Sequence, residues 1–219
     1  MKQADEDFEV VMRVIVQMRL DLAATFEEGH ETPVYFRTWN LFQDFVAKCH
    51  FQARAIRGVD PDSARYVAGG GPGTAYPYGM VWAKVSLKQK KVRKALVNTI
   101  VDNYKIPERV LRVIQADHLC NKKSVAHCPD GWLLIFPTLN EVNYRSGSSL
   151  EVGLRVDQDV DMIQLTPLHF FKLLSNFWPR NGDEFEKGMA IIEGQNMILG
   201  MGDKIRNYIG KRIDFPEIT

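Results

Sequence analysis

The feature that most constrains the fold of this chain is a pair of short apolar segments separated by a turn. The segments are "RVLRVIQADHL" at 109–119 and "WLLIFP" at 132–137, and "CPDG" lies just before the second one. Short runs of this kind predict strands, and turn residues between them predict that the strands pair as a hairpin. Asp117 and His118 lie at the end of the first predicted strand.

A short helix is predicted directly after the hairpin. Thr138 and Glu141 have the spacing of a capping box, in which two side chains satisfy the first amides of a helix. Gly147 is a typical residue at a helix end, and Asn143 lies between these signals. Residues 110–151 are therefore expected to form a strand, a second strand and a helix.

Helices are predicted for most of the remaining chain, because apolar residues recur there every three to four positions. A further strand is expected at 161–165. Helices are predicted at 8–28, 34–56 and 80–104, from Thr166 and Pro167 onward, and in a glycine-interrupted stretch after the turn at 180–183.

The predicted fold class is α+β and mainly helical, with a small ββα unit framed by N- and C-terminal helices. We expect a helical pair at 1–58, a Gly/Pro-rich connector at 59–80 and the other elements at 81–219, or one single domain overall. The triple glycine at 69–71 lacks the Gly-Lys-Ser/Thr ending of a phosphate-binding loop. A connector or a substrate-facing loop is expected there.

Charge is distributed unevenly along the chain, although the net charge is only +1. Residues 84–123 contain eleven lysines and arginines against three acids. Such a block can bind phosphates, although it can also be the solvated face of a helix. The candidate nucleic-acid-binding residues are Lys88, Lys90, Lys91, Arg93, Lys94, Lys122 and Lys123.

Composition argues against several other classes of protein. No apolar run approaches the roughly 20 residues of a membrane helix, and the acidic start lacks the basic region of a secretory signal, so no membrane partner and an intracellular, cytoplasmic location are expected. The three cysteines form no Cys-x-x-Cys pair, which argues against a disulfide framework and a structural zinc site. His127 and His169 are interpreted as ordinary histidines.

The hairpin with Asp-His, followed by a helix containing "NYRSG" at 143–147, resembles the HNH, or ββα-metal, nuclease superfamily. The resemblance covers about residues 110–151 and implies hydrolysis of phosphodiester bonds in DNA, with RNA not excluded. It implies that His118 is the general base and that Asp117 and Asn143 bind Mg²⁺ or Mn²⁺. Accessory roles are assigned to Asn140, Asp130 and Glu151, of which Asn140 is an alternative to Asn143 and Asp130 stands where the family has an asparagine that orients the histidine.

The chemistry of the reaction is consistent with these residue types. A histidine that is neutral near pH 7 can activate water, and carboxylate and amide oxygens are ligands that suit Mg²⁺. The alternative function is a non-catalytic nucleic-acid-binding or assembly protein, such as a viral nucleoprotein or a phage structural component. Such a protein would use the basic segment at 84–123 without chemistry.

Overall fold

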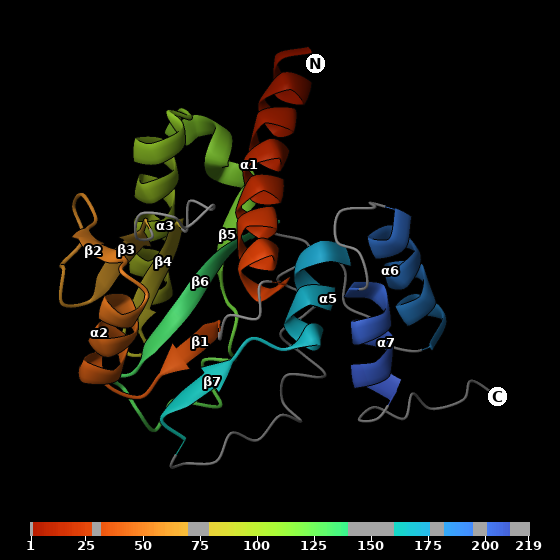
Figure 1. Ribbon diagram of the computed structural model, residues 1–219. Coiled ribbons are helices and arrows are strands. Elements are labelled where there is room, and N and C mark those ends of the chain that lie inside the picture. The colour runs from red at the N-terminus through yellow and green to blue at the C-terminus, as the bar shows by residue number, and fades with distance from the viewer. Residues whose placement is uncertain are drawn as a thin grey trace.

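The computed structural model describes residues 2–27, 32–69, 79–139, 160–175, 182–194 and 201–210. A curled antiparallel sheet organises these residues, and its strands run in the order β2-β3-β4-β6-β1-β7, with β5 paired to β6 (Figure 1). The strands are β1 Pro33–Phe36, β2 Gln52–Ala55, β3 Ala64–Ala68, β4 Gly79–Lys84, β5 Ile114–His118, β6 Trp132–Leu139 and β7 Met162–Gln164. The predicted fold class, a mainly helical protein around a small ββα-metal unit, is therefore wrong.

Helices cover both faces of this sheet. Figure 1 shows α1 and α2 in front of the sheet and α3 behind it, whereas α5, α6 and α7 lie together to one side. Among the helices, α5 contacts α6 and α7 and also touches α1. The bounds are α1 Lys2–Glu27, α2 Trp39–Lys48, α3 Gln89–Tyr104, the 3₁₀ helix η1 Glu108–Val113, α5 Pro167–Ser175, α6 Gly182–Gly194 and α7 Met201–Gly210.

Strand β6 is the centre of the sheet because three other strands pair with it. On one edge it pairs with β4, and on the other edge β1 and β5 follow one another end to end. Tyr35 of β1 lies opposite Leu133, and His118 of β5 lies opposite Ile135. One strand therefore holds together segments that are far apart in the sequence.

Aromatic side chains join α2 to the front of the sheet. The Phe42 ring stacks on the Trp132 ring at 5.0 Å between centroids, and it lies 5.3 Å from the Trp82 ring. Helix α2 begins directly after β1 because the Thr38 hydroxyl accepts a hydrogen bond from the Leu41 amide at 3.3 Å. Buried apolar residues from α1 to α7 belong to one continuous core.

The predicted hairpin is confirmed, because β5 and β6 pair in the antiparallel sense. Its first strand begins only at Ile114, since residues 108–113 form the 3₁₀ helix η1. The role of Thr138 as a helix cap is wrong, because Thr138 lies inside β6 opposite Gln115 and is buried. The rest of the helix predicted to follow the hairpin lies outside the described residues.

Two predicted helices are wrong over part of their length. Residues 34–56 form β1, α2 and β2, and residues 79–84 form β4 before α3 begins at Gln89. The stretch expected to be a connector at 59–80 contains β3. Strands β1 and β4 are buried along almost their whole length, so their sequences show no alternation that would distinguish them from a buried helix.

The remaining elements agree with the prediction. Helix α1 covers the first predicted helix, and β7 followed by α5 matches the strand and helix expected near Thr166. The C-terminal stretch contains α6 and α7, and the residues between these two helices lie outside the described part. Among the described helices, none is both long enough and apolar enough to cross a membrane.

Candidate nucleic-acid interface

The basic segment identified in the sequence is divided between two sides of α3. Side chains three or four residues apart lie on the same face of a helix, so Gln89 and Arg93 share one face, and Lys91 and Lys94 share another. The first pair contacts β5, and the second pair faces the loop between β2 and β3. These two faces have different roles.

The face of α3 that carries Arg93 supports the edge of the sheet. The Arg93 guanidinium donates to the carbonyl oxygens of Ile114 at 3.3 Å and Leu111 at 3.0 Å, and Gln89 donates to that of Ala116 at 2.6 Å. Backbone groups of an edge strand need partners when they are buried. Arg93, a predicted phosphate contact, is therefore bound to the fold itself.

Four lysines at the start of α3 are available to a ligand. Their side chains are exposed, and none forms an ion pair or a side-chain hydrogen bond with the part of the chain that the structure describes. The positive end of the helix dipole lies at the same place, because α3 begins at Gln89. These residues, called here the α3 lysines, are Lys88, Lys90, Lys91 and Lys94.

The loop between β5 and β6 adds charge to the same region. Lys122 donates from its ammonium group to the Leu87 carbonyl oxygen at 2.7 Å, and its neighbour Lys123 is exposed. Partial burial lowers the pKa of Lys122. The Val85 amide also donates to the Gly131 carbonyl oxygen at 2.8 Å. Two basic stretches that are about 30 residues apart in the sequence are thus brought together.

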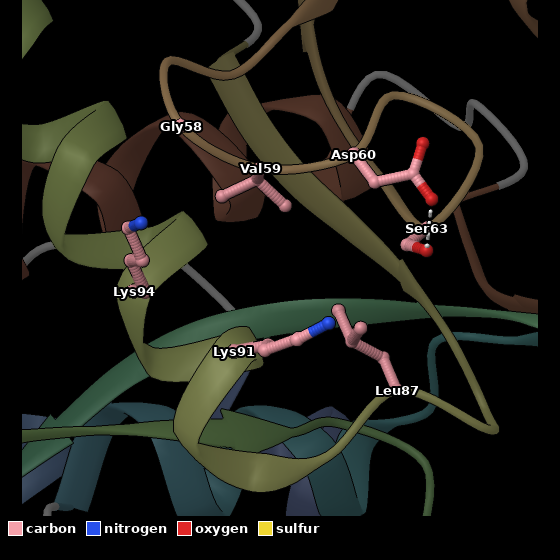
Figure 2. Close-up of a pocket in the computed structure, with 7 residues that line it drawn as sticks. All are labelled: Gly58, Val59, Asp60, Ser63, Leu87, Lys91 and Lys94. Carbon is pink, nitrogen blue, oxygen red and sulfur yellow. Dashed lines mark hydrogen bonds between the residues drawn. The ribbon is translucent and has the colours of Figure 1, made fainter.

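A pocket of about 100 Å³ lies between α3 and the loop that joins β2 to β3 (Figure 2). Lys94 projects from α3 toward Gly58, Lys91 points toward Leu87, and Val59 points into the space between the two lysines. The residues that line the pocket are Gly58, Val59, Asp60, Ser63, Leu87, Lys91 and Lys94. The loop residues cannot be recognised as part of the site from the sequence alone, because only the folded chain brings them next to α3.

A second, wider hollow of about 380 Å³ lies between α3 and η1. It is lined by Arg93, Glu108, Arg109 and Arg112, which carry three positive charges against one negative charge. Arg109 lies 4.0 Å from the Asp7 carboxylate of α1. Arg109 and Arg112 were not among the predicted binding residues, although their spacing of one helical turn in a basic segment was a usable signal.

Asp117 and His118 do lie at the end of a strand, as predicted, but on opposite faces of the sheet. Successive side chains alternate along a strand, and residues paired across an antiparallel ladder share a face. Asp117 lies opposite Phe136, and His118 lies opposite Ile135. Both are buried, with 8% and 9% of their surface exposed. The predicted metal ligand and the predicted base therefore do not point into one open site.

The face that carries His118 contains a second buried polar side chain. Tyr35 lies opposite Leu133, which is two residues before Ile135 on β6 and so shares its face. Burial raises the pKa of Tyr35 well above its usual value, and a hydrogen bond with Cys128 raises it further. Burial and this hydrogen bond to Cys128 are consistent with a structural role for Tyr35.

The other predicted site residues are only partly within the described chain. Asp130 is exposed at the turn before β6, and its carboxylate accepts a hydrogen bond from the Lys84 ammonium at 3.1 Å. Asn140, Asn143 and Glu151 lie outside the described residues. Among the described residues, no group of three or more His, Cys, Asp or Glu side chains is arranged to hold a metal ion.

A comparison of the chain with protein-family models found no match, and comparisons with curated proteins and with solved structures found none either. The resemblance to the HNH superfamily therefore stays a prediction.

Proposed function

We propose that this protein binds nucleic acid, DNA or RNA, inside the cell through the α3 lysines and Lys123, without performing chemistry on it. The observation that carries the proposal is the exposure of four lysine side chains at the positive end of one helix, with no protein partner among the described residues. Lysines in this state can exchange their counterions for phosphates of a nucleic-acid backbone.

The neighbouring cations differ from the α3 lysines, and this difference supports assigning the binding of nucleic acid to the α3 lysines. Arg93 and Lys122 already donate to backbone carbonyl oxygens, and Lys84 pairs with Asp130. A cation that is committed to the fold releases fewer counterions on binding a phosphate than an exposed one does. The proposal therefore limits the interface to a subset of the basic residues in 84–123.

Salt dependence tests this proposal. The test uses the doubly substituted variant Lys88→Gln/Lys90→Gln and single-stranded DNA. A plot of the logarithm of the affinity against the logarithm of the salt concentration should have a slope that is smaller in magnitude by about 1.4 than that of the wild type. At 0.1 M salt the variant should bind roughly twentyfold more weakly than the wild type. Fluorescence anisotropy with a labelled oligonucleotide, repeated between 50 and 200 mM salt, measures both quantities.

A matched control removes the same charge elsewhere. Lys48 on α2 and Lys187 on α6 are exposed, so Lys48→Gln/Lys187→Gln changes the net charge equally. This control should bind almost as the wild type does. Equal weakening in the two double variants, or wild-type binding that does not change with salt, would contradict the proposed interface.

The second candidate function is a metal-dependent HNH-like endonuclease, and the observation in its favour is the β5–β6 hairpin with Asp117-His118 at its end. The test is cleavage of plasmid and single-stranded DNA, and of RNA, with Mg²⁺ or Mn²⁺. The nuclease hypothesis expects wild-type cleavage that His118→Gln abolishes, whereas the binding proposal expects no cleavage by either protein. Thermal unfolding shows whether the variant at this buried position is folded.

A further inference from the structure

We propose that the pocket between α3 and the β2–β3 loop binds a phosphate monoester, the terminal phosphate of a nucleic-acid strand or that of a mononucleotide. This inference rests on the proposed function, and it names the group that one part of the interface recognises. It is carried by the small size of the pocket, the two lysines that line it and the way in which the loop is fixed.

Charge is the first argument for a phosphate monoester. Such a group carries about −1.5 to −2 charges at pH 7, whereas each phosphodiester of the backbone carries only one. Lys91 and Lys94 place two ammonium groups at the pocket, and neither has an ion-pair or hydrogen-bond partner among the described residues. The first turn of α3, next to Leu87, adds the positive end of a helix dipole.

Asp60, the one acid in the pocket lining, offsets one of the two lysine charges but not both. The two carboxylate oxygens of Asp60 accept hydrogen bonds from the Asp62 amide and the Ser63 hydroxyl, each at 3.0 Å. These bonds, followed by the charges of Lys91 and Lys84, lower the pKa of Asp60. Asp60 therefore holds the loop in shape, and the pocket keeps a net positive charge.

The loop is fixed against α3 before any ligand arrives. Asn98 of α3 donates to the Arg57 carbonyl oxygen at 2.6 Å, and the Arg57 guanidinium pairs with Asp102 at 3.0 Å. Gly58 has a φ of 68°, and a Cβ atom there would lie 3.2 Å from the Lys94 ammonium nitrogen. The positive φ therefore favours glycine here, and an added Cβ would also shift the Lys94 ammonium by a few tenths of an ångström.

The size of the pocket suits a single small group. The pocket has a volume of about 100 Å³, well below the roughly 300–1,000 Å³ of sites that bind drug-sized ligands, so it suits one small group such as a phosphate. A nucleobase with its sugar does not fit in this volume, so the remainder of a nucleotide or strand lies outside the pocket. Lys88 and Lys90, which are exposed at the start of α3, offer further charges to the phosphates of such a strand.

The decisive experiment compares oligonucleotides of one sequence that carry a 5′-phosphate, a 3′-phosphate or hydroxyl groups at both ends. Wild-type protein should bind at least one phosphorylated oligonucleotide about tenfold more tightly, as a charge-assisted contact contributes about 1.4 kcal/mol or more. Lys91→Gln and Lys94→Gln should each remove most of this preference. Lys90→Gln should weaken the binding of all three oligonucleotides by the same factor.

Adenosine monophosphate, added as a competitor, distinguishes the two sources of the phosphate. Loss of the preference at a saturating concentration shows that the pocket also accepts a free mononucleotide, whereas no loss shows that it reads a phosphate only on a strand. Equal, salt-dependent binding of all three oligonucleotides by the wild type would overturn the inference and leave the proposed function intact. Absence of binding to every oligonucleotide would overturn the proposed function itself.

Discussion

The two sides of α3 differ in what their positive charges contact. On the side toward β5, Arg93 donates to two carbonyl oxygens of the neighbouring backbone. On the side toward the β2–β3 loop, Lys91 and Lys94 line a pocket and have no ion-pair partner among the described residues. Arg93 and Lys94 are adjacent in the sequence, yet one stabilises the sheet and the other is available to a ligand.

This difference shows that the number of basic residues in a segment overestimates the size of a binding surface. A cation whose donors already reach carbonyl groups of the fold contributes to the free energy of unfolding, and its removal costs those hydrogen bonds. An exposed cation contributes little to stability but can contribute to binding. Paired substitutions on the two sides should therefore separate stability from affinity.

The largest expected effect on stability is that of Arg93→Met. Methionine keeps much of the apolar stem but removes two hydrogen bonds, one to the Ile114 carbonyl oxygen and one to that of Leu111, which keeps only the Ile114 amide as a donor. The free energy of unfolding should therefore fall by about 2 kcal/mol. The matched variant Lys90→Met should change it by less than about 0.5 kcal/mol. Urea unfolding measures both, and equal values for the two variants would remove the proposed distinction.

An intermediate effect is expected for Gly58→Ala. An alanine at a positive φ costs about 1–2 kcal/mol, and its Cβ would also displace the Lys94 ammonium. Gly69→Ala is the control, because Gly69 has a φ of 87° and an added Cβ there would meet no atom within 4 Å. Both variants should lose stability in thermal unfolding. Only Gly58→Ala should lose the preference for a phosphorylated strand, and retention of that preference would contradict the role given to this glycine.

The smallest effect is expected at two adjacent lysines of the β5–β6 loop. Lys122→Met removes the hydrogen bond to the Leu87 carbonyl oxygen and should lower stability by about 1 kcal/mol with little change in the salt dependence of binding. Lys123→Met should leave stability almost unchanged and lower the slope of the salt dependence by about 0.7 for single-stranded DNA. Urea unfolding and fluorescence anisotropy on both variants measure the two effects. Equal losses of stability, or equal changes in the salt dependence of binding, would contradict this prediction.

The part of the fold that the sequence could predict is the part with local signals. The hairpin of β5 and β6 has apolar runs bounded by "CPDG", and α1 and α5 have helical periodicity. Strand β4 was missed because "GMVWAK" is buried on both faces, and a continuous apolar run next to a helix has the same appearance as part of that helix. The order of the strands in the sheet depends on contacts between distant segments, which leave no local pattern.

Of the candidate site, only the positively charged residues could be predicted from the sequence. The lysines at the start of α3 were identified as a group, but the sequence did not show that Arg93 is committed to β5 or that the loop at Gly58 completes a pocket. The Asp117-His118 pair shows a different limit of the sequence. Two adjacent polar residues suggest a shared role, whereas the alternation of a strand separates their side chains by the thickness of the sheet.

The shared edge of β6 has a consequence for the order of folding. His118 and Ile135 pair across 17 residues, whereas Tyr35 and Leu133 pair across 98 on the same edge of the same strand. The entropy of loop closure disfavours the longer pairing by about 1.5 kcal/mol, so we expect the β5–β6 hairpin to form first and β1 to dock beside it later. In pulsed hydrogen exchange, the amides of β6 opposite β5 should become protected before those of β1. The N-terminal third of the chain would then complete a sheet that the middle of the chain has begun.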